Sequence, residues 1–353
     1  MAHNVASAGP PAGRSPGMQR GRPGRPWEKD RRTYAALDLG TNNCRLLIAR
    51  PSAGGFVIID AFSRIVRLGE GMALSGRISE AAIERAIAAL AVCAEKLRRR
   101  RVTLVRSVAT EACRRAANGA EFVARVHAET GIRLDVIDPG EEARLAVLGC
   151  QVLLPEGSGP ALIFDIGGGS TELVLVDAEG EEPRILDWYS APWGVVSLTE
   201  AEGADRPCGG AERLAAYARM RARVAEAFAG FAARLPGAQA APRLLGTSGT
   251  VTTLASLHLE LEYYDRRAVD GLVVPATAMR AISERLSGMS IADRALLPCI
   301  GSERADLVVA GCAILESILD IWPAERLSVA DRGIREGILR SLIARDLQRG
   351  WPA

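Results

Sequence analysis

The sequence predicts an α/β protein built from two similar domains, and three observations lead to this prediction. A strand, an aspartate–glycine loop, a second strand, a turn and a third strand follow one another near Thr33 and again near Ala161. Between and after these two units, strands alternate with helices, which is typical of layered α/β architectures. The chain has 353 residues, which is more than one domain usually contains. A repeat at this scale indicates two domains that face one another.

The first unit starts with an apolar strand over Thr33–Leu39. Its loop reads Asp-Leu-Gly-Thr-Asn-Asn from Asp38, and strands follow at Cys44–Ala49 and Phe56–Ala61, with a turn between them. Apolar residues that recur every three or four positions after Ser79 predict a helix. The elements expected to complete this half are a strand at Val102–Val108, a helix from near Asn118 to before Gly131, a strand at Arg133–Ile137 and a helix after Gly140.

The second unit repeats the first beyond a linker rich in glycine and proline at Pro155–Pro160. Its strand at Ala161–Ile166 leads into a loop with three consecutive glycines. The two copies align as Asp38 with Asp165, Gly40 with Gly167, Asn43 with Ser170, and Arg45 with Glu172. The other expected elements of this half are strands near Leu173–Val176, Arg184–Tyr189, Leu244–Gly246 and Arg326–Val329, and helices near Gly210–Leu235, Thr250–Leu259, Pro275–Leu286, Arg304–Ile321 and Gly333–Asp346.

These elements place the expected domain boundaries. Residues 1–32 are rich in glycine, proline, alanine and arginine without apolar periodicity, which indicates a disordered basic tail. Residues 33–157 are expected to form the N-terminal domain and residues 158–353 the C-terminal domain. The helix over about 333–346 is expected to pack back on the first domain.

Composition argues against several classes of protein. No stretch approaches the roughly twenty apolar residues that span a membrane, and no secretory signal opens the chain, so we expect a cytoplasmic protein without a membrane partner. The seven cysteines contain no CxxC pair and the three histidines have no metal-binding spacing, which argues against a disulfide framework and against His-ligated zinc. The formal net charge of +2 does not indicate a nucleic-acid partner.

Three loops carry residues that suit phosphate binding. Glycines expose backbone N–H groups in the loop that starts at Asp38 and in the loop from Gly167 to Ser170, and concave runs of N–H groups bind anions. A third loop, from Gly246 to Thr250, precedes a helix whose N-terminus also favours phosphate. Three such loops in one chain predict a protein that acts on phosphate groups.

Carboxylates beside these loops are candidates for metal binding and catalysis. Asp165 and Glu172 flank the triple-glycine loop, and carboxylate oxygens suit Mg²⁺. Glu141 and Glu142 stand at a helix start between the two repeats, so one of them is a candidate base, although acids at helix N-termini also have a purely structural explanation. Three arginines are candidates to bind phosphate oxygens: Arg45, Arg67 and Arg114.

At these residues the chain resembles the exopolyphosphatase and guanosine pentaphosphate phosphatase family (Ppx/GppA). Any one glycine loop would also fit sugar kinases, chaperone ATPases or actin, whereas the combination of motifs is specific. The segments that carry the resemblance span nearly all of the chain from Tyr34 onward: Ala36–Asn42, Arg67–Gly71, Val108–Thr110, Gly140–Leu145, Phe164–Glu172, Gly246–Thr250 and Asp331–Gly337. The additional helical domain of long family members is expected to be absent.

The resemblance implies an actin-like ATPase fold of two ribonuclease-H-like domains, with the substrate in the cleft between them. It implies that Glu142 is the base that prepares water for attack, and that Asp165 and Glu172 hold Mg²⁺ or orient the water. The expected phosphate-binding residues, two arginines among them, are Asp38, Gly40, Thr41, Asn42, Arg45, Arg114, Gly167, Gly168, Gly169, Ser170, Gly246, Ser248, Gly249 and Thr250.

The expected function is hydrolysis of the terminal phosphoryl group of inorganic polyphosphate by a homodimer that depends on Mg²⁺ or another divalent cation. A 5′-phosphohydrolase acting on guanosine pentaphosphate (pppGpp) is the alternative, because both substrates present the same reacting group. The family's first loop often reads Gly-Ser-Asn-Ser, whereas Thr41 and Asn43 replace the serines here, which leaves the fine substrate choice open. An ATP-dependent small-molecule kinase would need an acceptor pocket, and a non-catalytic polyphosphate or nucleotide sensor would not need the acids.

Overall fold

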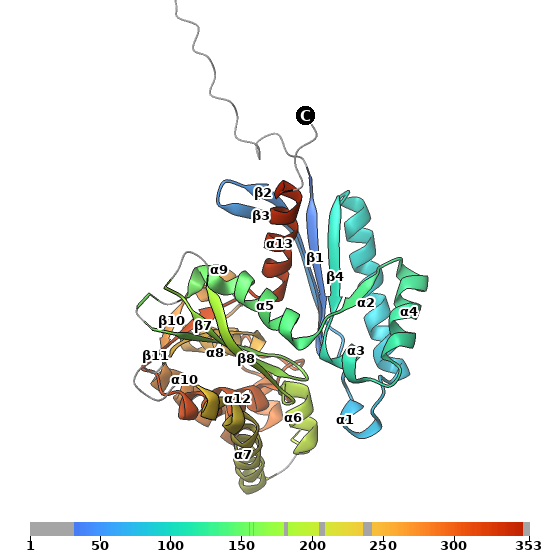
Figure 1. Cartoon of the computed structure of the whole chain (residues 1–353). Coiled ribbons are helices and arrows are strands. Elements are labelled where there is room, and N and C mark those ends of the chain that lie inside the picture. Colours follow the sequence, from blue (N-terminus) through green and yellow to red (C-terminus); the bar gives the residue numbers. More distant parts are fainter. Residues whose placement is uncertain are drawn as a thin grey trace, which may run out of the picture.

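The computed structural model describes residues 32–154, 156–157, 159–179, 183–204, 209–235 and 242–348. Within these residues the protein forms two α/β domains, each built on one mixed sheet (Figure 1). Nearly all of the basic segment 1–32 and part of the linker Pro155–Pro160 lie outside the described residues. No helix in the described part is both long enough and apolar enough to cross a lipid bilayer.

The first domain has a five-stranded sheet in the order β3-β2-β1-β4-β5. Its strands are β1 (Tyr34–Leu39), β2 (Asn43–Ser52), β3 (Gly55–Ile65), β4 (Leu104–Ala109) and β5 (Leu134–Val136). The helices in this half of the chain are α1 (Met72–Ser75), α2 (Glu80–Arg99), α3 (Glu111–Arg115), α4 (Gly119–Thr130) and α5 (Pro139–Cys150), followed by the 3₁₀ turn η2 (Gln151–Leu153). β1 pairs antiparallel with β2 and parallel with β4.

The second domain has a six-stranded sheet in the order β10-β11-β9-β6-β7-β8. Its strands are β6 (Ala161–Ile166), β7 (Thr171–Asp177), β8 (Arg184–Ala191), β9 (Arg243–Thr247), β10 (Val273–Pro275) and β11 (Arg326–Ala330). The helices are α6 (Val195–Ala201), α7 (Gly210–Arg234), α8 (Gly249–His258), α9 (Arg266–Val269), α10 (Ala276–Gly288), α11 (Ile291–Ala295), α12 (Val308–Ile321) and α13 (Ile334–Gln348). β6 pairs with β7 and β9 as β1 pairs with β2 and β4, so the sequence repeat is also a repeat of the fold.

The parallel strand pairs bring the loops of each domain to one edge of its sheet. Leu39 pairs with Ala109 at the ends of β1 and β4, and Asp165 pairs with Thr247 at the ends of β6 and β9. Because the carboxyl ends of parallel strands meet at one edge, the segments that follow them gather there. The glycine loops are therefore neighbours of residues far from them in sequence.

Most of the long elements lie close to where the sequence predicts them, and the differences concern short elements, one helix start and the length of β3, which ends at Ile65 rather than at Ala61. The helix expected over Arg304–Ile321 begins only at Val308, because the residues before it form turns. The elements that the sequence analysis did not predict are α1, α3, η2, α6, α9, α11 and β10.

Helices α5 and α13 cross between the two sheets, and each covers the sheet of the other half of the chain (Figure 1). Ile338 and Leu339 of α13 join Tyr34 and Val108 of the first sheet in one buried cluster. Ala143 of α5 belongs to the buried cluster on the second sheet. The two crossings between the domains are thus part of the domain cores.

Two glycines allow these helices to approach each other closely. A Cβ atom added at Gly337 would lie 2.0 Å from the carbonyl oxygen of Leu145, and one added at Gly149 would lie 1.9 Å from the carbonyl oxygen of Gly333. No side-chain carbon fits at such distances, so any larger residue must push the backbones apart.

We expect Gly337→Ala to lower the free energy of unfolding by about 1–3 kcal/mol, because overpacking of a close-packed interior strains the surrounding backbone. Urea unfolding followed by circular dichroism measures this change. Gly288→Ala is the matched control, because Gly288 ends a helix and nothing lies within 4 Å of an added Cβ there. The control should be neutral or slightly stabilising, and equal stability of the two variants would contradict the prediction.

Candidate active site

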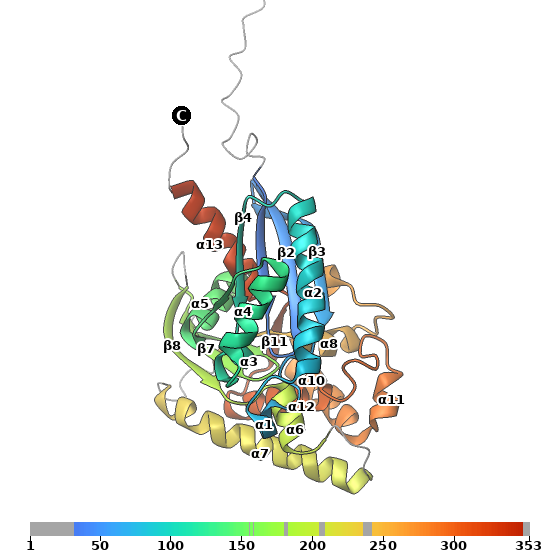
Figure 2. The same ribbon diagram turned by 90° about the vertical axis from the view of Figure 1, so that its right-hand side faces the viewer.

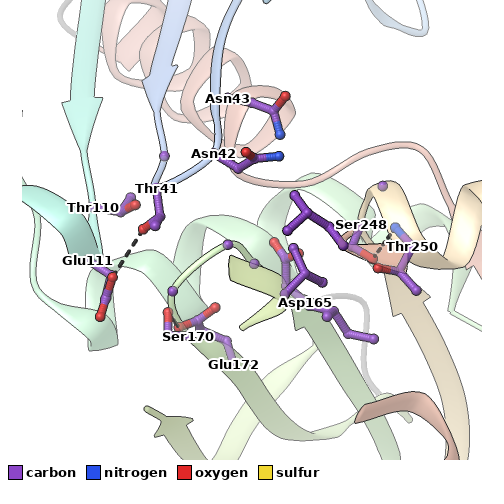
Figure 3. A pocket seen from close by; sticks show the side chains of 18 of the residues that line it. Thr41, Asn42, Asn43, Thr110, Glu111, Asp165, Ser170, Glu172, Ser248 and Thr250 are labelled. Atoms are coloured by element: carbon purple, nitrogen blue, oxygen red, sulfur yellow. Dashed lines mark hydrogen bonds between the residues drawn. The ribbon is translucent and has the colours of Figure 1, made fainter. Parts of the chain in front are cut away.

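A cavity of about 140 Å³ lies between the domains, and loops from both domains line it (Figure 3). The predicted site residues that line the cavity are Asp38, Gly40, Thr41, Asn42, Arg45, Glu142, Asp165, Gly167, Gly168, Gly169, Ser170, Glu172, Ser248, Gly249 and Thr250. Three predicted residues, Arg67, Arg114 and Gly246, are not part of its lining. The structure therefore brings all three glycine loops and the three candidate catalytic acids to one place.

The loop after β1 and the loop after β6 close in the same way. The backbone N–H of Gly40 donates to the carbonyl of Asn43 at 2.9 Å, and that of Gly167 donates to the carbonyl of Ser170 at 3.0 Å. The aligned positions in the sequence are thus equivalent positions in the structure.

The two hairpins differ in the charge that stands opposite their aspartate. Asp38 pairs with Arg45 across β1 and β2, whereas Asp165 pairs with Glu172 across β6 and β7. The first half of the site therefore places a cation where the second half places an acid.

The two loops touch one another across the gap between the domains. A Cβ atom at Gly168 would lie 3.0 Å from both the backbone nitrogen of Asn42 and the Cβ of Thr41. Glycine at this position allows the domains to close until the loops meet.

Glu111 is a cavity residue that the sequence analysis did not single out. Its Oε2 accepts a hydrogen bond from the Thr41 hydroxyl at 3.1 Å (Figure 3). A Cβ atom at Gly169 would lie only 1.9 Å from the same oxygen. Glu111 follows β4, the parallel neighbour of β1, and this strand pairing is the signal that could have placed it beside the first loop.

The third loop is shaped by Ser248. This residue has a φ of 144°, which few non-glycine residues adopt, and such strain is typical of functional sites. Its hydroxyl accepts hydrogen bonds from the N–H groups of Thr250 and Val251 at 3.2 and 3.3 Å. The side chain thus occupies two of the amides of α8 that the sequence suggested for phosphate.

Gly246 lies inside β9 and does not line the cavity. A Cβ atom there would lie 2.6 Å from the ring of Phe164. Its small size serves the packing of the core, and phosphate contact at this residue is not supported by its position.

Glu142 lies one turn into α5, which Asp138 caps by accepting a hydrogen bond from the N–H of Glu141. The Glu142 side chain is buried, with 8% of its surface exposed, and its Oε2 accepts a hydrogen bond from Arg114 Nη1 at 2.8 Å. Arg114 also donates to the carbonyl of Ile137. The structure thus uses Arg114 to hold Glu142 in place, in a position different from the phosphate contact that the sequence suggested.

Burial changes the acidity of the cavity acids. Burial, followed by repulsion from Glu172, raises the pKa of Glu142 well above its usual value, although Arg114 acts in the opposite direction. Burial and repulsion from Glu172 also raise the pKa of Asp165 to about 7. The pKa of Asp38 is raised by burial as well, against the attraction of Arg45. Holding these acids together in their ionised form costs free energy, and a bound cation would lower that cost.

The donor set fits Mg²⁺. Asp38 Oδ1 is buried and has no hydrogen-bond partner among the described residues. Glu172 Oε1 accepts hydrogen bonds from Ser170 and Ser190, while its Oε2 lies toward Gly167. In the described part of the chain no three acids enclose a metal by themselves. This arrangement suits an ion that takes one or two carboxylates and completes its shell with water and phosphate oxygens.

The charges of the lining separate into five carboxylates and two guanidinium groups. The carboxylates are Asp38, Glu111, Glu142, Asp165 and Glu172, and the guanidinium groups are those of Arg45 and Arg304. The sequence analysis did not predict Arg304 as a site residue, because it precedes α12 and lies far in sequence from the loops.

The family model described as "Ppx/GppA phosphatase family" matches residues 47–346. Exopolyphosphatase 2 of Mycobacterium tuberculosis is 34% identical to this chain over 321 residues, which cover 87% of this chain and 98% of that protein. A crystal structure of the Ppx/GppA family member from Aquifex aeolicus superposes with a TM-score of 0.71 and 30% identity, and covers 89% of this chain and 98% of that one.

A longer relative matches only in part. The guanosine-5′-triphosphate,3′-diphosphate pyrophosphatase of Aeromonas salmonicida is 29% identical over 88% of this chain. The chain spans 59% of the length of that protein.

Proposed function

The chain belongs to the Ppx/GppA phosphatase family, and from this premise we propose that it hydrolyses the terminal phosphoryl group of inorganic polyphosphate. As a phosphatase of this family it is a hydrolase of phosphoanhydride bonds. The observation that carries the proposal is the position of Glu142, a buried carboxylate held by Arg114 at the cavity that the phosphate-type loops line.

The proposed mechanism is in-line attack of water on the terminal phosphoryl group. Glu142 accepts the proton of the attacking water, and burial raises its pKa, which makes it a stronger base than an exposed glutamate. The N–H groups of the loops after β1 and β6, with Arg45, hold the phosphoryl oxygens and stabilise the charge that develops on them.

Asp165 and Glu172 are the residues that would hold Mg²⁺. Mg²⁺ held there would neutralise charge on the phosphoryl oxygens. Ser170 and Ser190 fix the Glu172 carboxylate through hydrogen bonds of 2.7 and 2.9 Å, which orients its other oxygen toward the loop.

Two observations favour polyphosphate over pppGpp. Among the described residues that line the cavity, none has an aromatic ring or an imidazole on which a guanine could stack. The relative named exopolyphosphatase 2 is 34% identical to this chain, whereas the relative named for the guanosine substrate is 29% identical. Hydrolysis of pppGpp to ppGpp is the second candidate, because its 5′ end presents the same reacting group.

Phosphate release from purified protein with Mg²⁺ tests the proposal, with long-chain polyphosphate and pppGpp compared at equal concentrations of phosphoanhydride ends. We expect faster release from polyphosphate, measured as kcat/KM. Preference for pppGpp would favour the second candidate, and inertness toward both substrates would overturn both.

We expect the acidic limb of the pH profile of kcat/KM to lie above the usual pKa of a glutamate, which is about 4.3. The base must be ionised and its pKa is raised, so activity falls as the pH drops through that raised value. Initial rates between pH 4.5 and 9 measure the limb. Because the substrate also titrates, Arg114→Met is the control: loss of this cation should move the limb to higher pH, and a limb that stays in place would contradict the assignment.

A further inference from the structure

A bidentate ion pair joins the two domains outside the cavity. Arg67, in the loop between β3 and α1, donates from Nη1 to Asp306 Oδ2 at 2.7 Å and from Nη2 to Asp306 Oδ1 at 3.2 Å. Its Nη2 also donates to the carbonyl of Glu303 at 3.1 Å. Both side chains are mostly buried, and neither lines the cavity. Bidentate guanidinium–carboxylate pairs fix geometry as well as charge.

The backbone beside Arg67 is bonded directly to the first phosphate loop. The N–H groups of Val66 and Arg67 both donate to the carbonyl of Asn42, at 2.9 and 3.0 Å, and the N–H of Gly69 donates to the carbonyl of Thr41 at 2.9 Å. Arg67 has a φ of 47°, in the left-handed region that arginine seldom adopts. The chain is thus held in an unfavourable conformation that ties this loop to the ion pair.

The second phosphate loop is supported in the same way from its own domain. The N–H groups of Val195 and Val196, at the start of α6, donate to the carbonyls of Gly167 and Gly168 at 2.9 and 2.7 Å. In both loops, backbone carbonyl groups thus accept hydrogen bonds from the N–H groups of a neighbouring segment of the same domain.

These two supporting segments also meet each other. α1 and α6 lie side by side, as Figures 1 and 2 both show. The N–H of Gly71, which caps α1, donates to Glu200 Oε1 of α6 at 2.8 Å. A second contact thus crosses between the domains four residues after Arg67.

In the second domain, Asp306 is next in sequence to residues that line the cavity. Arg304, Leu307 and Val308 all line the cavity, and Asp306 lies among them in sequence. Arg67 therefore binds a residue whose neighbours in the chain form part of the cavity wall.

We propose that Arg67 and Asp306 are a positioning pair, which holds the first phosphate loop at its working distance from the second domain. This inference rests on the proposed function, in which the terminal phosphoryl group contacts loops of both domains at once. Without the pair, the substrate must supply the free energy that closes the domains.

The expected effect is therefore on KM. If the two domains of a variant are closed in only about a tenth of the molecules, its KM rises about tenfold. The reason is that the apparent affinity falls in proportion to the fraction of molecules that can bind substrate. Once saturated, the enzyme is closed by its substrate, so kcat should stay within about twofold of the wild-type value.

Arg67→Asn and Asp306→Asn test the pair. Asparagine tolerates the left-handed backbone at residue 67, so the first variant keeps the loop conformation. Arg64→Ala is the control, because it removes an arginine from the end of β3 whose guanidinium lies over the Phe62 ring, 5.3 Å from its centre. The double variant Arg67→Asp with Asp306→Arg restores the pair with reversed charges.

We expect KM for polyphosphate to rise about tenfold in each single variant and to return to within about threefold of the wild-type value in the double variant. Small-angle X-ray scattering of the substrate-free proteins should show a larger radius of gyration for the single variants than for wild type and Arg64→Ala. Unchanged KM and unchanged scattering in both single variants would overturn the proposal, as would a double variant as impaired as the single ones. Scattering needs no substrate, so a protein that releases no phosphate would overturn the proposed function while the pair is still tested.

Discussion

The variant Glu142→Gln should lose at least about a hundredfold in kcat while the protein remains folded. Glutamine has the shape of glutamate, and its amide oxygen can still accept the hydrogen bond that Arg114 Nη1 makes to Glu142 Oε2 at 2.8 Å. The substitution therefore removes the ability to take a proton and leaves the position of the side chain intact. Phosphate release measures kcat, and circular dichroism measures thermal unfolding.

Glu141→Gln is the matched control on the same helix. Glu141 pairs with Arg144 and Arg106, and hydrogen bonds from these residues, led by Arg144, lower its pKa to about 2. It does not line the cavity, so this variant should keep nearly all of its activity and lose a little stability at neutral pH. Activity of Glu142→Gln within threefold of wild type, or an equal loss in both variants, would remove Glu142 from the role of base.

The variant Asp165→Asn should be inactive and more stable than the wild type. The raised pKa means that the folded state binds the proton more tightly than the unfolded state does. The wild type therefore loses stability as the pH rises from about 4 through about 7, and the asparagine variant does not. We expect Asp165→Asn to raise the free energy of unfolding at pH 8 by about 1–3 kcal/mol, and kcat to fall at least about a hundredfold, because Asp165 is one of the two carboxylates proposed to hold Mg²⁺.

Urea unfolding at pH 5 and pH 8, with a chelator present, measures the difference between variant and wild type. Asp60→Asn is the control with the opposite sign, because hydrogen bonds from Lys96 and Arg100 lower the pKa of Asp60 to about 2. It should destabilise the protein at pH 8. If the Asp165→Asn variant is no more stable than the wild type at pH 8, the ionised form of Asp165 does not destabilise the folded protein.

The parts of the fold that could be predicted are those whose local sequence and tertiary surroundings agree. β1 and β6 are apolar strands that end in glycine loops, and α2 has an apolar stripe after an N-capping serine. α6 could not be predicted, because its residues Val195, Val196 and Thr199 favour a strand in isolation. It becomes a helix because Gly194 starts it through a hydrogen bond to Ser197, and because its first N–H groups bond to the second loop.

The site was predictable in so far as its residues stand next to glycines in the sequence. Glu111 and Arg304 reach the cavity through strand pairing and chain reversal, which no local pattern records. Arg114 shows a second limit. An arginine near a phosphate site can bind phosphate or hold an acid, and only the hydrogen bond to Glu142 distinguishes the two roles.

The exchange of helices between the two domains has a consequence for synthesis of the protein. The face of the first sheet that carries Tyr34, Ala36 and Val108 is complete once β5 has been made, but α13, which covers it, begins about 200 residues later. At about 5–20 residues per second, ribosomes take roughly 10–40 s over that interval. During this time the nascent chain exposes an apolar surface that it cannot yet bury, so the N-terminal domain finishes folding only after the C-terminal domain has been translated.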